Sequence, residues 1–337
     1  MTIELMGGRL SGHVARQCLA LGLATIAMLT AAQATAQGFP SRPVRVVVPY
    51  PPGGIGDTVT RSLTQSMGDA LGQPFVIDNK PGASQMIGAE LVARAPADGH
   101  TLFLGSVTSL AINVNSQKRL NYDPQKDFAP VGMAFHSPLY LVVHPAVAAN
   151  SVRELIALAK SQPGRLSFAS VGQGGSVHLA GELFRSMAGL DMLHVPYKGS
   201  APALTDLISG QVNLMFDAGV SALPQARAGK LRALAVTSRA RSASAPELPT
   251  VAEAGGLSGY EAIIWFALVA PAGTPRDAIL LLSQELGRAM RAPGLRERFA
   301  PQGVEFAPGT PEELAQVIRS EIPKWGKVLK DANVAPE

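Results

Sequence analysis

Hydrophobic positions near residue 45 follow a strand–loop–helix pattern. Residues 46–48 form a β-branched run that favours a buried strand, and the proline and glycine residues of 49–56 end it. Asp57 follows at a position suited to a helix N-cap, because its carboxylate can accept hydrogen bonds from free N–H groups. Apolar residues then recur at helical spacing and predict one buried helix face: Val59, Leu63, Met67, Ala70 and Leu71.

The same pattern recurs more than a hundred residues later. Residues 166–170 predict a strand, residues 171–175 a flexible loop, and Ser176 a cap for the helix that follows. Such a unit directs backbone N–H groups and the positive end of a helix dipole beyond the strand. A single unit is most often an ordinary turn. Two of them, facing each other, suggest a ligand with two anionic ends held between the loops.

The rest of the chain alternates strands and helices with short connections, which predicts an α/β fold. Residues 133–144, interrupted by Pro138, and residues 260–270 are long extended apolar stretches that we interpret as two crossings between lobes. We expect one lobe at residues 37–138 and 264–337 and the other at 139–263. A hinged pair of lobes can close around a ligand in the cleft between them.

The first 36 residues have the pattern of a secretory signal peptide. Arg9 and Arg16 precede a 15-residue apolar stretch, and Ala34-Thr35-Ala36 provides a small-x-small cleavage site. A membrane-spanning helix would need about 20 apolar residues. We therefore expect export to the periplasm with cleavage near Ala36. The only cysteine, Cys18, lies in this segment, so the mature chain has neither disulfides nor thiolate ligands.

Charge and composition narrow the classes of partner. Removing Glu4, Arg9 and Arg16 lowers the formal net charge from +4 to +3, and basic residues do not cluster as in a nucleic-acid footprint. Aromatic residues are 5 % of the chain, which favours a carboxylate over a sugar ligand. We expect no cofactor and no metal, because the mature chain's histidines lack metal-ligand spacing: His100, His136, His144, His178 and His194.

A periplasmic hydrolase is the rival class, since Ser176, His178 and Asp217 include the residue types of a catalytic triad. However, Ser176 and His178 are two residues apart near a helix start, where their side chains point in different directions. No G-x-S-x-G motif surrounds Ser176. The glycines at 172 and 174 lack the third glycine of a dinucleotide motif, because Val177 stands there. We therefore expect no catalysis.

Ordered motifs along the mature chain carry a family resemblance. They are PYPPGG at 49–54, NKPGA at 79–83, DGHTL at 98–102, the serine–glycine loop at 170–178, PYKG at 196–199, GKLRALAVTS at 229–238, LPTVAEAG at 248–255 and APAGTP at 270–275. From about Pro40 onward the chain resembles the extracytoplasmic solute receptors of tripartite tricarboxylate transporters, the Bug family. One departure is GASQMIG at 82–88, where the family usually has more glycine; we expect this segment outside the cleft.

The resemblance implies a type II periplasmic-binding-protein fold, with two α/β lobes joined by two crossing strands. It also implies capture of a small carboxylate and delivery to an integral-membrane permease. A receptor for a signalling sensor kinase is the alternative that the sequence leaves open. Dicarboxylates, tricarboxylates, aromatic acids, amino acids and a nicotinate-like ring all remain possible ligands, and we expect a monomer.

Site residues follow from the same resemblance. The first wall of the cleft would comprise Tyr50, Pro51, Gly54 and Asp57, supported by Ser106. The second would comprise Ser170, Gly172, Gln173, Gly174, Ser176 and His178. Asp57 is assigned capping before ligand contact, because its charge repels an anion. Asp217 would bind an amino or hydroxyl group of the ligand or serve as a turn residue, and Tyr197 would donate its hydroxyl or simply pack.

The glycine loops contain no basic residue. The sequence therefore predicts carboxylate recognition through neutral N–H and hydroxyl donors instead of an arginine clamp.

Overall fold

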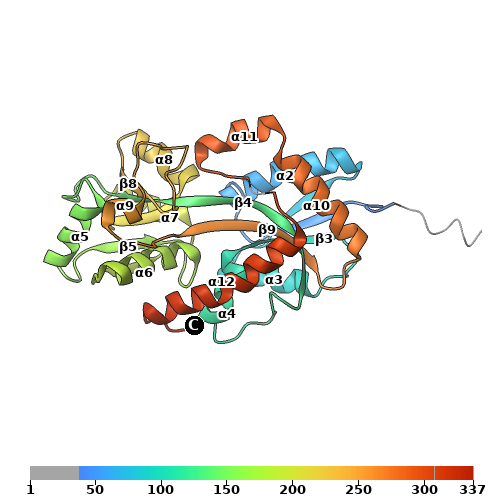
Figure 1. Ribbon diagram of the computed structural model, residues 1–337, viewed down its shortest axis with the longest axis horizontal. Helices are drawn as coiled ribbons and strands as arrows, with labels where there is room; N and C mark the ends of the chain where they lie inside the picture. Colours follow the sequence, from blue (N-terminus) through green and yellow to red (C-terminus); the bar gives the residue numbers. More distant parts are fainter. Residues whose placement is uncertain (1–37, 307, 337) are drawn as a thin grey trace, which may run out of the picture. The chain divides into compact units, whose positions relative to one another are not determined.

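The computed structural model describes residues 38–306 and 308–336. The chain divides into two units, Met1–Ser41 and Arg42–Glu337, and all helices and strands below belong to the second (Figure 1). The predicted signal peptide and its cleavage site lie outside the described residues.

The N-terminal strands form one part of a mixed sheet. Strands β1, β2 and β3 are parallel, and β9 joins β3 in the antiparallel sense. The sheet order is β2-β1-β3-β9-β4, so β1 lies between two parallel neighbours and its valines are buried. The elements of this part are β1 (Val44–Val48), α2 (Ile55–Leu71), β2 (Phe75–Asn79), α3 (Met86–Ala93), β3 (Thr101–Ser106) and β9 (Ile263–Pro271).

A second group of strands continues the sheet on the other side of β4 (Phe128–Val143), in the order β4-β7-β5-β6, and β8 also pairs with β4. Parallel strands β5, β6 and β7 are connected through helices. The elements are α5 (Val152–Ser161), β5 (Ser167–Ser170), α6 (Ser176–Ala188), β6 (Leu193–Pro196), α7 (Ser200–Ile208), β7 (Leu214–Ala218), α8 (Gly219–Arg227), β8 (Arg232–Val236) and α9 (Val251–Gly255).

Strand β4 is shared by both groups of strands. Its residues up to Pro138 pair with β9, and those from Leu139 onward pair with β7. The predicted interruption at Pro138 is wrong, because Pro138 lies opposite Ile263, the first residue of β9, where its missing N–H costs little. The next residue, Leu139, donates its N–H to the Thr237 hydroxyl at 2.7 Å. Figure 1 shows β4 in green and β9 in orange side by side.

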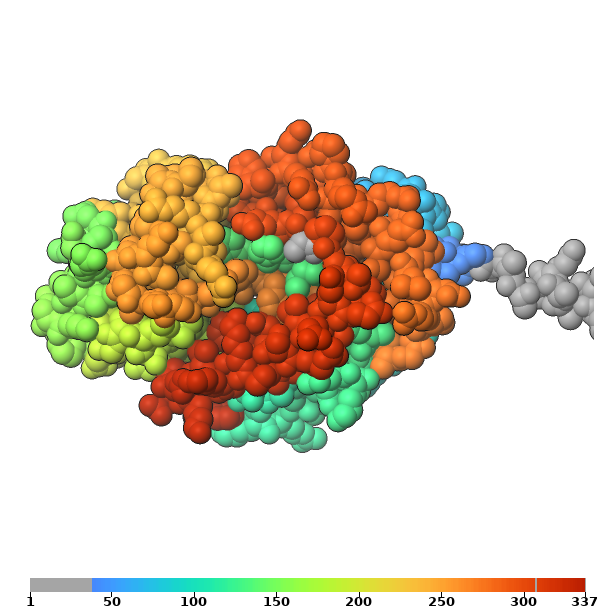
Figure 2. Space-filling view, in the orientation of Figure 1, coloured from blue at the N-terminus to red at the C-terminus, as the bar shows by residue number. Residues whose placement is uncertain are grey.

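The C-terminal helix α12 (Pro311–Asp331) contacts elements of both groups, including β4, α4 (Asn113–Ser116) and α6. Thr310 caps it in a capping box with Glu313. Figure 2 shows α12 in red along one face, with a hollow beside it. The remaining elements are η2 (Ala83–Gln85), the π-helical segment η3 (Thr108–Ile112), α10 (Arg276–Met290), α11 (Pro293–Phe299) and η4 (Ala300–Gln302).

The contact between α6 and β5 generates a stability prediction. A Cβ atom at Gly181 would lie 2.5 Å from the Phe168 ring, whereas one at exposed Gly294 in α11 would meet nothing within 4 Å. We expect Gly181→Ala to lower the free energy of unfolding by about 1–3 kcal/mol through overpacking. Gly294→Ala should be neutral or stabilise by up to about 1 kcal/mol. Urea denaturation measures both, and equal midpoints would contradict the packing account.

Candidate functional site

The first glycine loop is held by Asp57. Its carboxylate accepts hydrogen bonds from the Gly53 N–H at 2.9 Å, from Asn79 Nδ2 at 2.9 Å and from Arg61 Nε at 3.0 Å. The predicted N-cap role of Asp57 is wrong, because α2 begins at Ile55 and Gly54 is the N-cap in an extended conformation. Asp57 is instead the third residue of the helix and reaches back to the loop.

Asp57 carries its charge inside the protein, where it is 2 % exposed. Burial by itself raises its pKa, but hydrogen bonds from Arg61, Gly53 and Asn79 outweigh this effect and lower the pKa below its ordinary value. Asn79 also donates to the Tyr50 carbonyl at 2.9 Å and accepts from Arg61 at 3.0 Å. The loop is thereby fixed at both ends to β2 and α2.

Tyr50, Gln85 and Ser106 form a chain of side-chain hydrogen bonds. Gln85 Nε2 donates to the Tyr50 hydroxyl at 2.7 Å, and the Ser106 hydroxyl donates to Gln85 Oε1 at 2.8 Å. The Thr108 N–H donates in turn to Ser106 Oγ at 3.2 Å. Burial raises the pKa of Tyr50 well above its ordinary value, so the phenol keeps its proton. The side chains of Ser106 and Gln85 both hydrogen-bond with that phenol group.

Gln85 was missed by sequence reasoning, which placed residues 82–88 outside the cleft. That expectation stays a prediction, although Gln85 contacts two of the predicted site residues, Tyr50 and Ser106. Ala83, Ser84 and Gln85 have φ values of 45°, 48° and 74°, a left-handed conformation that costs non-glycine residues about 1–3 kcal/mol each. Asn113 Nδ2 donates to the Ser84 carbonyl at 2.9 Å and holds the segment there. The signal available in the sequence was that residues 83–85 are not glycine, although the family usually has more glycine in this segment.

The serine–glycine loop is held by a side chain of its following helix, as the first glycine loop is held by Asp57. The Gly174 N–H donates to His178 Nδ1 at 3.0 Å, and the Ser170 hydroxyl donates to the Gly172 carbonyl at 2.8 Å. Helix α6 begins at Ser176 with Gly175 as its N-cap, so the predicted cap role of Ser176 is wrong. Asp57 and His178 are each the third residue of their helix, and each accepts the N–H of the residue before the N-cap.

The proton positions beneath the second loop follow from its hydrogen bonds. Ser170 has one hydroxyl hydrogen, which Gly172 takes, so His194 Nε2, at 2.6 Å, must donate to Ser170 Oγ. His178 accepts at Nδ1, so its Nε2–H faces Glu182 at 3.5 Å. The two imidazole rings stack with centroids 3.8 Å apart. Burial and the neighbouring His178 lower the pKa of His194 to about 4.

Glu182 completes this buried group on α6. Burial raises its pKa, but hydrogen bonds from His178 and Arg185 outweigh burial and lower it. Arg185 donates from Nε to Glu182 at 2.8 Å. His178 is only 3 % exposed, so it acts here as a support of the loop.

The structure brings the second loop against the segment that follows Ser106. The Ser176 N–H donates to Thr108 Oγ1 at 3.4 Å. Gly174, with φ 68°, lies so close to Ser116 that a Cβ atom would be 3.4 Å from that side chain. Three predicted residues are exposed on the two loops, namely Pro51, Gly54 and Gln173. Ser176 of the second wall therefore contacts the segment that follows Ser106 of the first wall.

Asp217 and Tyr197 have partners within the chain. Asp217 is 1 % exposed and accepts hydrogen bonds from the hydroxyls of Ser200 at 2.9 Å and Ser221 at 2.6 Å. Burial raises its pKa, and the two serines oppose that rise. The Tyr197 hydroxyl donates to Asp206 at 2.8 Å. Of the alternatives that the sequence left open, these contacts favour the structural roles.

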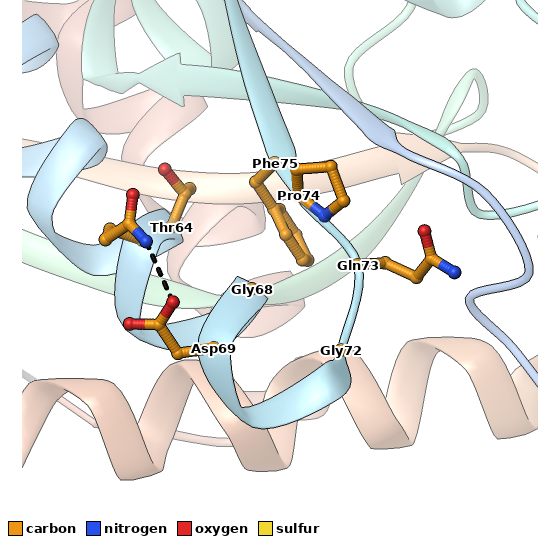
Figure 3. A pocket seen from close by; sticks show the side chains of 8 residues that line it. Thr64, Gly68, Asp69, Gly72, Gln73, Pro74 and Phe75 are labelled. Carbon is orange, nitrogen blue, oxygen red and sulfur yellow. Dashed lines mark hydrogen bonds between the residues drawn. The ribbon is translucent and has the colours of Figure 1, made fainter.

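A surface pocket lies elsewhere, between the end of α2 and the start of β2 (Figure 3). Gln65 Nε2 donates to Asp69 at 2.8 Å on its wall. None of the predicted site residues lines this pocket, whose residues are Thr64, Gln65, Gly68, Asp69, Gly72, Gln73, Pro74 and Phe75. Within residues 38–306 and 308–336, no group of three or more histidine, cysteine or acidic side chains is arranged to hold a metal ion.

Comparisons with known proteins agree on one family. Residues 59–334 match the model for the tripartite tricarboxylate transporter family receptor. A UPF0065 protein in the tcbD-tcbE intergenic region of Pseudomonas sp. strain P51 is 40 % identical over 94 % of each chain. BugT of Bordetella pertussis is 38 % identical, with 89 % of this chain and 92 % of BugT covered.

Solved structures with bound ligands are also similar. Rpa4515 of R. palustris with adipate is 37 % identical, has a TM-score of 0.84, and covers 89 % of this chain and 100 % of its own. MatC of Rhodopseudomonas palustris with bound malate is 35 % identical and has a TM-score of 0.79. The match covers 86 % of this chain and 100 % of the MatC chain. The type II periplasmic-binding-protein fold expected from the sequence is confirmed by this agreement.

His194 generates a prediction of pH dependence. Because its pKa falls from about 6.5 in the unfolded chain to about 4 in the fold, the unfolded state binds the proton first. The contribution of His194 to stability is therefore complete above pH 6.5 and is lost as the pH falls towards 4. The melting temperature of wild type should drop more steeply over this range than that of His194→Gln, which keeps an amide donor for Ser170. Parallel curves would contradict the assignment.

Proposed function

The chain belongs to the tripartite tricarboxylate transporter family of receptors, and we propose that it captures a small carboxylate in the periplasm and delivers it to a membrane permease. The observation that carries this proposal is the pair of glycine loops, each supported from beneath and each followed by a helix N-terminus. The adipate and malate bound to the two similar structures support the ligand class.

The proposed mechanism uses neutral donors. The first N–H groups of α2 and α6 have no partner within their helices, and the positive ends of the helix dipoles favour an anion there. Because Asp57 and His178 take the N–H groups of Gly53 and Gly174, the loops keep a fixed shape. The Ser176 N–H donates to Thr108 Oγ1, so the anion is assigned to the other N–H groups at the starts of the two helices. The Tyr50 hydroxyl adds a side-chain donor.

The predicted site residues divide into two roles. Those that contact the ligand are Tyr50, Pro51, Gly54, Gly172, Gln173, Gly174 and Ser176. Those that hold the loops are Asp57, Ser106, Ser170 and His178. Closure moves the lobe of residues 139–263 against the lobe of 37–138 and 264–337, with β4 and β9 as the crossing strands.

Transport also requires export and a membrane partner. Residues 1–36 are the export signal, cleaved near Ala36, and the receptor delivers its ligand to a permease of the tripartite tricarboxylate class. In the part of the chain that the structure describes, no helix combines the length and the apolar character needed to span a bilayer.

A variant of Gly54 tests the proposal. Gly54 already has an N-cap conformation, φ −75° and ψ 171°, and a Cβ atom there would meet only the Pro51 carbonyl at 4.0 Å. Gly54→Asp should fold, because aspartate is a preferred N-cap, but its carboxylate would occupy the N–H groups of α2 and repel an anion. When the acid concentration is 100 times its dissociation constant, we expect the free energy of unfolding of wild type to rise by about 2.7 kcal/mol. Gly54→Asp should not show this rise.

Thermal-shift titrations with adipate and malate measure the effect. Gly294→Asp, on the exposed surface of α11, is the matched control for an added charge and should keep the wild-type response. Equal responses of both variants would place the ligand elsewhere, and a wild type that responds to sugars but to no acid would refute the carboxylate class.

A further inference from the structure

We infer that this receptor selects carboxylic acids that lack an ammonium group over amino acids of the same skeleton. The inference rests on the proposed function and names the substrate class more narrowly. It follows from the two carboxylates of the predicted site, Asp57 and Asp217, whose oxygens accept hydrogen bonds from the protein's own donors.

The first wall has few acceptors left for a ligand. Asp57 is the only carboxylate among its predicted residues, and its charge is balanced by Arg61 while Gly53 and Asn79 also donate to it. Gln85 donates to the Tyr50 oxygen at 2.7 Å. A ligand therefore finds the charge of Asp57 already paired and the phenol oxygen of Tyr50 already hydrogen-bonded.

The Ser106 hydroxyl already donates one hydrogen bond and accepts another within the protein. Its hydroxyl donates to Gln85 Oε1 and its oxygen accepts the Thr108 N–H. The buried amide of Gln85 is thereby satisfied from both sides. The first wall presents donors to a ligand, and its strongest acceptors face inward.

The predicted carboxylate and the loop supports between residues 139 and 263 repeat this arrangement. Asp217, the residue that the sequence offered as a partner for an amino group, is 1 % exposed and accepts from Ser200 and Ser221. Ser170 Oγ accepts from His194, and His178 Nδ1 accepts from Gly174. The acceptors beneath this loop are therefore also committed.

An ammonium group carries three donors and no acceptor, so it needs carboxylate or carbonyl oxygens when it leaves water. A buried donor without a partner costs about 1–3 kcal/mol, and more when it is charged. The positive ends of α2 and α6 add repulsion of a cation. An acid without the ammonium group meets none of these costs, while its carboxylates gain the same N–H donors.

The test uses matched pairs that differ only in the ammonium group: succinate and aspartate, glutarate and glutamate, adipate and 2-aminoadipate. Calorimetric titration of the mature protein should give a dissociation constant about tenfold or more smaller for the plain acid of a bound pair. A similar or smaller dissociation constant for the amino acid would overturn this inference and leave the carboxylate receptor intact. Failure of all six acids to bind would overturn the proposed function, and this inference with it.

A charge variant tests whether the pairing of Asp57 causes the selectivity. Arg61 is half exposed and contacts Asp57 at 2.9 Å, so Arg61→Gln should unmask the carboxylate and narrow the preference within each bound pair by several-fold. Arg276→Gln is the control, because Arg276 pairs with Glu312 on an exposed surface, and it should keep the wild-type preference. An unchanged preference in Arg61→Gln, with the fold intact by circular dichroism, would overturn the role given to Asp57.

Discussion

The hydrogen bond from the Gly53 N–H to the Asp57 carboxylate is the constraint on which the first half of the site depends. A loop of prolines and glycines has little intrinsic preference for one shape, and ordering its glycines is costly in entropy. Asp57 supplies the missing order because it is buried, ionised and hydrogen-bonded to Asn79 and Arg61 as well. Removing any of these donors would leave a buried charge with incomplete compensation.

The second loop solves the same problem with a different chemical group. His178 occupies the same position in α6 that Asp57 occupies in α2, and it accepts the equivalent N–H as a neutral imidazole. Its other nitrogen faces Glu182, and its ring stacks on His194. A charged acceptor therefore supports one loop and a neutral acceptor supports the other.

The sequence predicted features that depend on local pattern. Both strand–loop–helix units, the two crossing stretches and the family were predicted correctly, because strand runs, glycine loops and helix periodicity are encoded within a few residues of each other. The starts of α2 and α6 were misplaced, because Asp57 and Ser176 resemble N-caps in sequence but lie at the third and first positions of their helices. Asp57 still accepts a loop N–H, that of Gly53, from inside its helix.

Features that depend on distant partners were beyond the sequence. Gln85 reaches Tyr50 and Ser106 only because three residues in succession adopt left-handed angles, a choice that Asn113 stabilises from another part of the chain. The burial of Asp217 depends on Ser200 and Ser221, which come from two different helices. The spacing of hydrophobic residues predicts neither of these arrangements.

Binding of one ligand by both glycine loops can be measured by an NMR titration of glycine-¹⁵N-labelled protein with adipate. The amide signals of both loops should shift together with one dissociation constant, namely those of Gly53, Gly54, Gly56, Gly172, Gly174 and Gly175. Shifts confined to one loop, or to glycines outside both loops, would contradict binding of one ligand by both loops.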